Sequence, residues 1–447
     1  MTPALYKRDS IRIFYIPLYP KVGGGIASLY ASLLLPSKGV AVHIFEANDR
    51  VGGRVWTYRF SDDKEQFFEA GTMRIPKSPI HRPVLDIIFN RVYLNDGRRD
   101  DGSKFSLSDF DSLTAHRLGF DLPHPYTNIT AIGLLEPIIQ TFVKALQNDF
   151  TIGYHRIMKH DDLSFRMYLR SAAQWPPEVI DFYSLGFTEV IGRNMDFSTR
   201  EWFTIKDGMD RLPNAMARIT GPQNITLNAR VRGFAELPSG GITINFDSSA
   251  ATNPMDIVFD SVILALPLQQ SVACLLTGRD GRPLEAALRA VYFKPLFKLG
   301  LPFKTRFWEA RSSSVVWGTI HHGPLGRLPF QWDGHSGARV LLTYPWMTDA
   351  NTWLPLDFAK LLHKEINVHN EFIEGKAICG SSNWSRGDAM FLPGQHTAYA
   401  RVLATHERGV YFAGEHLSCH HAWIVGAIDS ALNTSVVVIH SKRRFNQ

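Results

Sequence analysis

The sequence has few cysteines, little net charge for its length and no long uninterrupted apolar segment. Its 447 residues include only three cysteines, Cys274, Cys379 and Cys419. An odd number of widely spaced cysteines provides neither a disulfide framework nor the ligand spacing of a zinc site, so we expect a reducing, cytoplasmic location. No stretch approaches the roughly 20 apolar residues of a membrane helix, and we expect no membrane contact.

The charge balance also excludes a strongly basic or acidic protein. The formal net charge is +6, and the basic residues are scattered except for a cluster of three at positions 442–444. We interpret this cluster as a solvated tail and expect no nucleic-acid partner. The N-terminal region resembles a secretory signal, but Pro17 and Pro20 interrupt it and no small-residue cleavage site follows. We therefore interpret it as mature sequence.

Apolar residues make up 45% of the chain, which is enough for a large core. The length suggests two or more lobes. The chain opens with an apolar strand over 11–16, a helix over 26–35 and an alternating strand over 40–45. This pattern predicts a parallel sheet with a crossover helix. From about 107 to 199 the apolar spacing is helical, and a later apolar run at 262–267 is typical of a strand buried on both faces.

A glycine-rich loop, Val-Gly-Gly-Gly-Ile-Ala-Ser at 22–28, joins the first strand to the first helix. Gly23 permits the tight turn, and Gly25 lets the backbone approach a diphosphate at the positive N-terminus of the helix. Glu46 ends the next strand about 20 residues further on, where a carboxylate can accept hydrogen bonds from ribose hydroxyls. A dinucleotide is the predicted ligand. A structural turn with a surface glutamate is the alternative.

Two features depart from the usual dinucleotide loop. Ser28 stands where a third glycine is usual. Pro17 and Pro20 precede the loop, although proline removes a hydrogen bond from a sheet and belongs at edges or bulges. Either the first strand stops at Ile16 and an insertion leads to Gly23, or this end of the chain differs from what the fold favours.

A second group of motifs lies near the C-terminus. Val-Tyr-Phe-Ala-Gly-Glu-His occupies 410–416, and Ala-Trp-Ile occupies 422–424. Together with the N-terminal loop, these segments indicate the two halves of one flavin site, so the cofactor domain must be discontinuous. Glu415 follows a strand and could accept hydrogen bonds from the ribityl chain. The amides around Trp423 and Ile424 would stabilise the negative charge of a reduced flavin ring.

Further motifs extend this pattern along the chain. They are Arg-Val-Gly-Gly-Arg at 50–54, Gly-Thr-Met-Arg-Ile-Pro at 71–76, Asp-Gly-Met-Asp-Arg-Leu-Pro at 207–213, Asn-Ala-Arg-Val at 228–231, Phe-Lys-Leu at 297–299 with Phe-Trp-Glu at 307–309, Asn-Trp-Ser at 383–385 and Pro-Gly-Gln at 393–395. In order and spacing they resemble the flavin-containing amine oxidases over nearly the whole chain. The Met-Arg-Ile-Pro loop is most similar to fungal and bacterial L-amino-acid oxidases, whereas Asp207 replaces a glycine of the family pattern.

The resemblance implies an α/β fold with three parts. These are an FAD-binding Rossmann-like domain of the glutathione-reductase type, a mixed-sheet substrate domain and a helical segment. The expected boundaries are 1–75, 202–270 and 395–447 for the FAD domain, 76–106 and 271–394 for the substrate domain, and 107–201 for the helical domain. The resemblance also favours a homodimer.

The resemblance assigns further cofactor contacts. Gly53 and Arg54 of the Gly-Gly-Arg turn would meet the diphosphate, and the backbone of Val231 would face adenine. Met73 would lie beside the cofactor. Some monoamine oxidases attach FAD through a cysteine in the segment that corresponds to 388–392, and this segment has no cysteine here. We therefore expect noncovalent FAD.

The resemblance also assigns catalytic roles. Arg74, counted among the cofactor contacts as well, would bind a substrate carboxylate, because a planar guanidinium forms two parallel hydrogen bonds with it. Without the resemblance, Arg74 could be a surface arginine. Tyr344 matches the family tyrosine that shares this carboxylate. Lys298 matches the lysine that holds a water against the flavin and helps oxygen to reoxidise it. Trp384 and Trp423 would form aromatic walls.

The predicted reaction is FAD-dependent oxidation of an L-amino acid to a 2-oxo acid, with release of ammonia and hydrogen peroxide. An amine or polyamine oxidase is the first alternative, because its substrates have no carboxylate and need no Arg74. A catalytically degenerate flavin-fold protein is the second, suggested by Ser28 and the two early prolines. No metal is expected, because His420 and His421 lack further ligands at suitable spacing. No catalytic base is assigned, and the candidates are His116, His124, His155 and His160.

Overall fold

The structure is a computed structural model that describes residues 12–15, 23–62, 66–91, 99–100, 121–186, 202–238, 241–248, 255–266, 282–305, 319–320, 330–332, 339–343, 376–379, 387–404 and 409–445. Several residues that the sequence singled out lie outside these ranges. They are Pro17, Pro20, His116, Tyr344 and Trp384.

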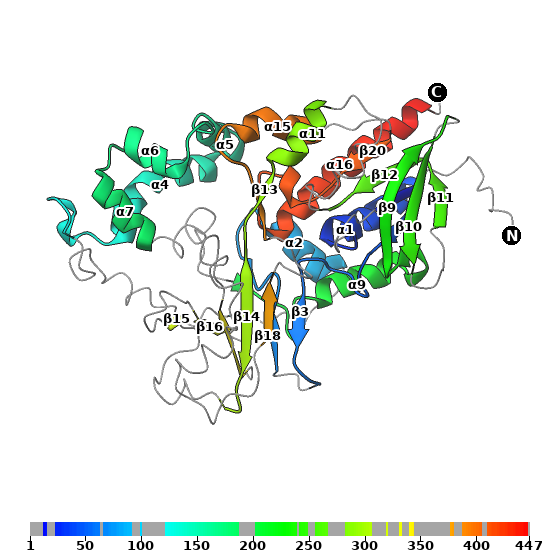
Figure 1. Cartoon of the computed structure of the whole chain (residues 1–447), viewed down its shortest axis with the longest axis horizontal. Helices are drawn as coiled ribbons and strands as arrows, with labels where there is room; N and C mark the ends of the chain where they lie inside the picture. Colours follow the sequence, from blue (N-terminus) through cyan, green and yellow to red (C-terminus); the bar gives the residue numbers. More distant parts are fainter. Residues whose placement is uncertain are drawn as a thin grey trace.

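A five-stranded parallel sheet forms the centre of the cofactor-binding part (Figure 1). Its order is β20 (Val410–Phe412), β12 (Ser261–Leu264), β1 (Arg12–Tyr15), β2 (Ala41–Phe45) and β8 (Ile225–Thr226). Each neighbouring pair is parallel. β1 is therefore central, as the opening strand–helix–strand pattern predicted, and it ends at Tyr15, before both prolines.

A three-stranded antiparallel sheet packs beside the parallel sheet. It consists of β11 (Met255–Phe259), β10 (Ile242–Ser248) and β9 (Ala229–Glu236) in that order. Val231 of β9 is fully buried in the same core as Phe45 of β2. The rings of Phe45 and Phe246 lie 4.6 Å apart between centroids, which joins the two sheets.

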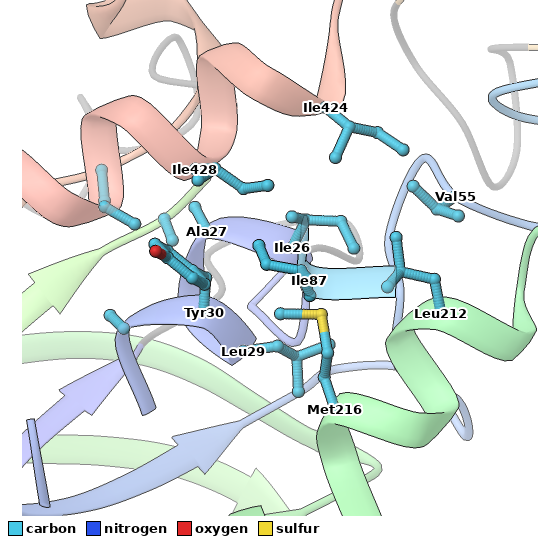
Figure 2. Close-up of a cluster of buried hydrophobic side chains, with 14 of the residues drawn as sticks. Ile26, Ala27, Leu29, Tyr30, Val55, Ile87, Leu212, Met216, Ile424 and Ile428 are labelled. Carbon is cyan, nitrogen blue, oxygen red and sulfur yellow. The ribbon is translucent and has the colours of Figure 1, made fainter. Parts of the chain in front are cut away.

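Three helices form the core next to the glycine loop. They are α1 (Ile26–Leu34), α9 (Arg211–Thr220) and α16 (Ile424–Phe445). Figure 2 shows Leu29 of α1 beside Met216 of α9, and Ala27 of α1 beside Ile428 of α16. α1 is apolar on nearly all sides because it is enclosed by these neighbours. The glycine loop at its start is consequently held in a rigid core.

Among the described residues, one segment has the length and hydropathy of a membrane span. It is Ile424–Ser441 of α16, with a mean hydropathy of 1.3 and 44% of its residues buried. This segment was not expected from the sequence, because serine, threonine and asparagine interrupt its apolar run. Ile428, Ala431 and Val438 of this helix belong to the core that includes α1. Packing in this core accounts for the apolar character of the buried side of α16.

A second five-stranded sheet lies apart from the parallel sheet, in the lower middle of the view in Figure 1. Its order is β15 (Thr319–Ile320), β16 (Phe330–Trp332), β17 (Val340–Thr343), β14 (Phe297–Pro302) and β18 (Lys376–Cys379). All pairs within it are antiparallel. The apolar segment 291–303 is divided at Pro295, which has no amide hydrogen to continue the ladder. Its first part, β13 (Tyr292–Phe293), pairs separately with β19 (Ala389–Met390).

Four helices form a separate cluster, as the apolar spacing of this region predicted (Figure 1). They are α4 (Ala131–Asn148), α5 (Phe150–Met158), α6 (Phe165–Ser171) and α7 (Pro177–Gly186). The hydroxyls of Thr130 and Ser164 and the carboxylate of Asp149 accept hydrogen bonds from the first turns of α4, α6 and α5, which fixes where these helices begin. The three domain boundaries given above remain predictions.

The remaining elements connect these parts. They are β3 (Thr57–Arg59), β4 (Phe67–Glu69), β5 (Ile75–Pro76), β6 (Arg99–Asp100), β7 (Trp202–Phe203), α2 (Arg82–Asp86), α11 (Arg282–Ala290), α15 (Gln395–Ala404), the π-helical turn η2 (Ile87–Arg91) and the 3₁₀ turns η1 (Pro36–Lys38), η4 (Tyr126–Asn128), η5 (Pro222–Asn224) and η7 (Glu415–Leu417).

Candidate active site

The glycine loop and Glu46 form one hydrogen-bonded unit. The backbone N–H groups of Gly23 and Gly24 donate to Glu46 Oε2 over 2.7 and 2.5 Å. The backbone and side-chain nitrogens of Asn48 donate to Oε1 over 2.8 and 2.6 Å. Burial raises the pKa of Glu46, and these four hydrogen bonds oppose that rise. These bonds hold the glycine loop, just before α1, against the end of β2.

Two observations test whether this loop fits a dinucleotide. Ser28, which replaces the third glycine, is fully buried in the first turn of α1, and its Oγ has no hydrogen-bond partner in the described part of the chain. Gly52 has a φ of +101° and donates to Gly24 O over 2.7 Å, which fixes the Gly-Gly-Arg turn against the glycine loop. A Cβ at Gly52 would lie 2.6 Å from Val55 O. A buried hydroxyl without a partner, in the first turn of the helix that follows the glycine loop, fits the diphosphate of FAD.

Arg54, Glu415 and two backbone amides form a buried junction between distant segments. Arg54 Nη1 lies 2.8 Å from Glu415 Oε1 and also donates to Gly387 O over 2.8 Å. The amides of Ala389 and Ala422 donate to the two oxygens of Glu415 over 3.0 and 3.1 Å. Burial by itself would raise the pKa of Glu415, but Arg54 and two nearby histidines lower it well below the usual range. Glu415 is therefore ionised and joins the two sequence motifs predicted to bind FAD.

The loop that follows β4 connects this junction to Lys298. The side chain of Lys298 is 1% exposed, and its Nζ donates to Glu69 O over 2.9 Å and to Gly71 O. On the other side of the loop, the Thr72 amide donates to Arg54 O over 3.0 Å. Gly71 permits this approach, because a Cβ there would lie 1.8 Å from Arg54 O. The buried lysine and the Gly-Gly-Arg turn are thus held together by one loop.

Met73 and Arg74 continue this loop into β5. Met73 is 7% exposed, and its carbonyl accepts a hydrogen bond from Thr204 Oγ1 over 3.3 Å. Arg74 is half-buried. Arg74 therefore follows directly on backbone that contacts both Arg54 and Lys298, so the loop places these three predicted site residues in one region.

Trp423 and Ile424 lie where α16 begins. Ile424 is buried, and the ring of Trp423 packs edge-on against His81, with 4.9 Å between ring centroids. His81 is 1% exposed and accepts or donates one hydrogen bond with Ser78 Oγ over 2.9 Å. Burial, aided by His420, lowers the pKa of His81 to about 4, so this imidazole is neutral near pH 7.

Sequence reasoning missed the histidines that gather around Glu415. His416 is buried and its pKa is lowered to about 3 by burial, with further contributions from Arg54 and His421. His421 Nδ1 lies 3.7 Å from Glu415 Oε2. His416 ends the first C-terminal motif and His421 directly precedes the second, and this position was the signal that could have indicated them.

Of the histidines that the sequence offered as bases, the three that the structure describes lie elsewhere. His124 and His155 are exposed, and the ring of His160 packs against Phe142 and Tyr168 in the helical cluster. No group of three or more potential metal ligands occurs among the residues that the structure describes. The metal expectation therefore stays a prediction, and no base is assigned.

The parallel sheet, the glycine loop and the acidic residue at the end of β2 together define a dinucleotide-binding protein of the flavoprotein type. The family model for flavin containing amine oxidoreductases matches residues 27–439. The chain belongs to this family, and FAD is its cofactor. The sequence prediction of family, fold class and cofactor is confirmed.

The relatives are named either as L-amino-acid oxidases or as amine oxidases. The chain is 25% identical to a putative L-amino-acid oxidase of Bacillus subtilis (strain 168), over 93% of each chain. It is 27% identical to an L-amino-acid oxidase of Siganus canaliculatus, over 93% of this chain and 84% of the relative. A putative bifunctional amine oxidase of Dictyostelium discoideum is 26% identical, and the match spans 92% of this chain but only 45% of that protein.

Solved structures agree with the fold. A double mutant of putrescine oxidase, from a redesign of cofactor binding, superposes with a TM-score of 0.70 at 17% identity, over 96% of this chain and all of that one. Cyclohexylamine oxidase from Brevibacterium oxydans gives a TM-score of 0.58 at 15% identity. At this identity the likeness establishes the architecture, and the substrate has to be argued from the site.

Proposed function

We propose that the protein is an FAD-dependent L-amino-acid oxidase. The overall reaction converts an L-amino acid, oxygen and water into a 2-oxo acid, ammonium and hydrogen peroxide. The glycine loop and the Gly-Gly-Arg turn would hold FAD, which would supply the acceptor for a hydride from the substrate Cα and the donor of two electrons to oxygen. The contribution of the protein is to bind and orient the substrate.

The observation that carries the proposal is the loop from Gly71 to Arg74. It contacts the Gly-Gly-Arg turn through Thr72 and the buried Lys298 through the Gly71 carbonyl. A guanidinium on this loop is a reasonable anchor for a carboxylate, because two parallel charge-assisted hydrogen bonds fix both position and orientation. Amine substrates offer no carboxylate for such an arginine to bind.

The other proposed roles follow the family pattern. Tyr344 would share the substrate carboxylate with Arg74, and Trp384 and Trp423 would enclose the substrate. Lys298 would hold a water near the flavin. The support for Lys298 is its burial in β14, since a buried ammonium is retained only where its hydrogen bonds are satisfied.

Peroxide production tests the proposal. The FAD-loaded protein is assayed against a panel of L-amino acids and a panel of amines and polyamines. Removing a bidentate charge-assisted contact costs about 3 kcal/mol, so Arg74→Ala should lower kcat/KM for the best amino acid about 100-fold. Arg74→Lys should restore only part of the loss, because lysine cannot form the paired contact. Arg82→Ala, an exposed arginine on α2, is the matched control and should be unchanged.

An amine oxidase is the second candidate, because a solved neighbour is putrescine oxidase. Activity on amines alone, unaffected by Arg74→Ala, would replace the first proposal by this one. A protein that binds a full complement of FAD and oxidises neither panel would support the catalytically degenerate alternative. The visible absorbance of bound FAD is therefore recorded for every preparation.

A further inference from the structure

The carboxylate of Glu415 has an acceptor position that faces His421. Oε1 accepts hydrogen bonds from Arg54 and Ala389, whereas Oε2 accepts one from the Ala422 amide. A carboxylate oxygen accepts about two hydrogen bonds. His421 Nδ1 lies 3.7 Å from Oε2, which is too long for a hydrogen bond but close enough to help lower the pKa of Glu415. A movement of about 1 Å would close this gap.

His421 itself has a reason to make that bond. Within the described part of the chain, both of its ring nitrogens are buried and without a hydrogen-bond partner. A neutral imidazole always carries one N–H, and a buried N–H without an acceptor destabilises the folded protein. Glu415 Oε2, 3.7 Å from Nδ1, is an ionised acceptor beside it. The fully formed site should therefore include a hydrogen bond from His421 Nδ1 to Glu415 Oε2.

A second histidine, His396, lies next to His421. The rings of His396 and His421 are nearly perpendicular, at 86°, with 6.3 Å between centroids. Phe391 packs edge-on against both rings, at 5.1 and 5.7 Å. His396 Nε2 lies 3.0 Å from the hydroxyl of Tyr154. The orientation of His421 is thus limited by Phe391 and by a histidine that is itself hydrogen-bonded.

Tyr154 belongs to the helical cluster, whereas His396 lies in the first turn of α15. Figure 1 shows α5, which carries Tyr154, next to α15. Asp161, just beyond α5, secures this contact: its carbonyl accepts from the Gly394 amide over 2.6 Å and its Oδ2 accepts from the Thr397 amide over 2.9 Å. The start of α15 is therefore capped by a residue from the helical cluster.

The charged groups around His396 favour its neutral form. Burial and the neighbouring His421 lower the pKa of His396, and Asp161 opposes them. Tyr154 keeps its proton, because burial, together with Cys419 and Asp161, raises its pKa to about 12. Nε2 of a neutral His396 can accept a hydrogen bond of ordinary length from the Tyr154 hydroxyl.

We propose that His421 is a positioning residue for FAD binding. It donates to Glu415 and fixes the carboxylate beside Arg54, while Tyr154 and His396 hold the His421 ring in place. The helical cluster thereby contributes to cofactor affinity without contacting the cofactor. The proposal rests on FAD as the cofactor and on Glu415 as part of its site, and it is independent of whether the substrate is an amino acid or an amine.

The test measures the dissociation constant of FAD from reconstituted apoprotein, by quenching of flavin fluorescence and without substrate. A hydrogen bond to a charged group is worth a tenfold change or more, so His421→Leu should weaken FAD binding about 10-fold. His421→Asn places an amide N–H where Nδ1 stands and should bind FAD within about 3-fold of the native protein. His421→Gln places its amide near Nε2 instead and should resemble the leucine variant.

A double-mutant cycle tests the contribution of the helical cluster. Tyr154→Phe should weaken FAD binding about 3-fold in the native background and should have no effect when His421 is already leucine, because residues that act through one contact are not additive. Tyr168→Phe, in the same cluster, is the matched control and should bind FAD normally.

Three results would overturn the proposal. They are normal FAD binding by His421→Leu, equal losses in the asparagine and glutamine variants, or fully additive effects of Tyr154→Phe and His421→Leu. Thermal unfolding of each apoprotein separates loss of affinity from loss of folding. Should the leucine variant not fold, the asparagine–glutamine comparison and a cycle of Tyr154→Phe with His421→Gln decide the question.

Discussion

The buried pair of Arg54 and Glu415 allows a quantitative prediction about stability. Glu415→Leu removes the carboxylate but leaves the guanidinium in place, and Glu415→Gln keeps the shape and one acceptor oxygen while removing the charge. The glutamate is 4% exposed, whereas the side chain of Arg54 retains 28% exposure. Glu415 also accepts hydrogen bonds from the amides of Ala389 and Ala422. Its loss therefore affects three segments at once.

The expected magnitude follows from these contacts. Removing one partner of a buried ion pair costs about 3–5 kcal/mol, because the other charge is left uncompensated. Because Arg54 is partly exposed, leaving its charge uncompensated should cost an amount at the lower end of this range, about 3 kcal/mol. The two backbone amides that lose an acceptor in Glu415→Leu add about 1 kcal/mol. We expect about 4 kcal/mol for Glu415→Leu and about 2 kcal/mol for Glu415→Gln.

Urea unfolding of the apoprotein, followed by tryptophan fluorescence and far-ultraviolet circular dichroism, measures both variants without interference from FAD. Glu285→Gln provides the matched control, since Glu285 pairs with Arg289 on an exposed helix surface. Such a pair contributes about 0.5 kcal/mol. If Glu415→Leu were no more destabilising than this control, the junction would not be an energetically important contact.

The pH dependence has a definite sign. The pKa of Glu415 in the folded protein is lowered below the unfolded value of about 4.3, so the stabilisation is fully present above that pH and is lost as the pH falls towards the folded pKa. The difference between native protein and Glu415→Gln should therefore be the same at about pH 6 and pH 8 and should shrink below about pH 4. A difference that grows on acidification would contradict the assignment of an ionised Glu415.

Three other substitutions probe the site. Gly71→Ala should cost more than about 3 kcal/mol or prevent folding, because its Cβ would lie 1.8 Å from Arg54 O, whereas Gly233→Ala has open space and should be neutral in the same urea assay. Ser28→Ala should stabilise the apoprotein by about 1 kcal/mol, since it removes a buried hydroxyl without a partner. If that hydroxyl contacts the cofactor, the same substitution should weaken FAD binding. A more stable apoprotein with unweakened FAD binding would argue against such a contact. The native protein should lose about 3 kcal/mol of stability between about pH 6.5 and pH 4, because the folded pKa of His81, about 4, lies below the unfolded value. His81→Asn should remove most of this loss. Identical pH profiles of the two proteins would refute a buried neutral His81.

Part of the site was predictable because its residues are close together in the sequence. The glycine loop, Glu46 and the Gly-Gly-Arg turn follow one another along a strand–helix–strand unit, and the order of hydrophobic and glycine residues there is dictated by local geometry. The family pattern also singled out Lys298, which is buried in the structure, and its role stays a prediction. These features and the family motifs led to the correct fold class and cofactor.

Other parts were beyond sequence reasoning because they depend on contacts between distant segments. Arg54 and Glu415 are 361 positions apart, and neither motif indicated that the two side chains pair. The contact between Tyr154 and His396 joins residues 242 positions apart, and nothing in either local sequence required it. Pairings of this kind are set by how whole layers pack, so they become visible only when the layers are assembled.

The sequence by itself determined the cofactor class, the parallel sheet with its crossover helix and the glycine turns that are predicted to approach a diphosphate, since backbone conformation and side-chain size at those positions are local properties. The tertiary structure alone decided which ionisable side chains meet around Glu415 and how strongly their pKa values shift. Burial and charge proximity produce those shifts, and both are properties of the packed molecule.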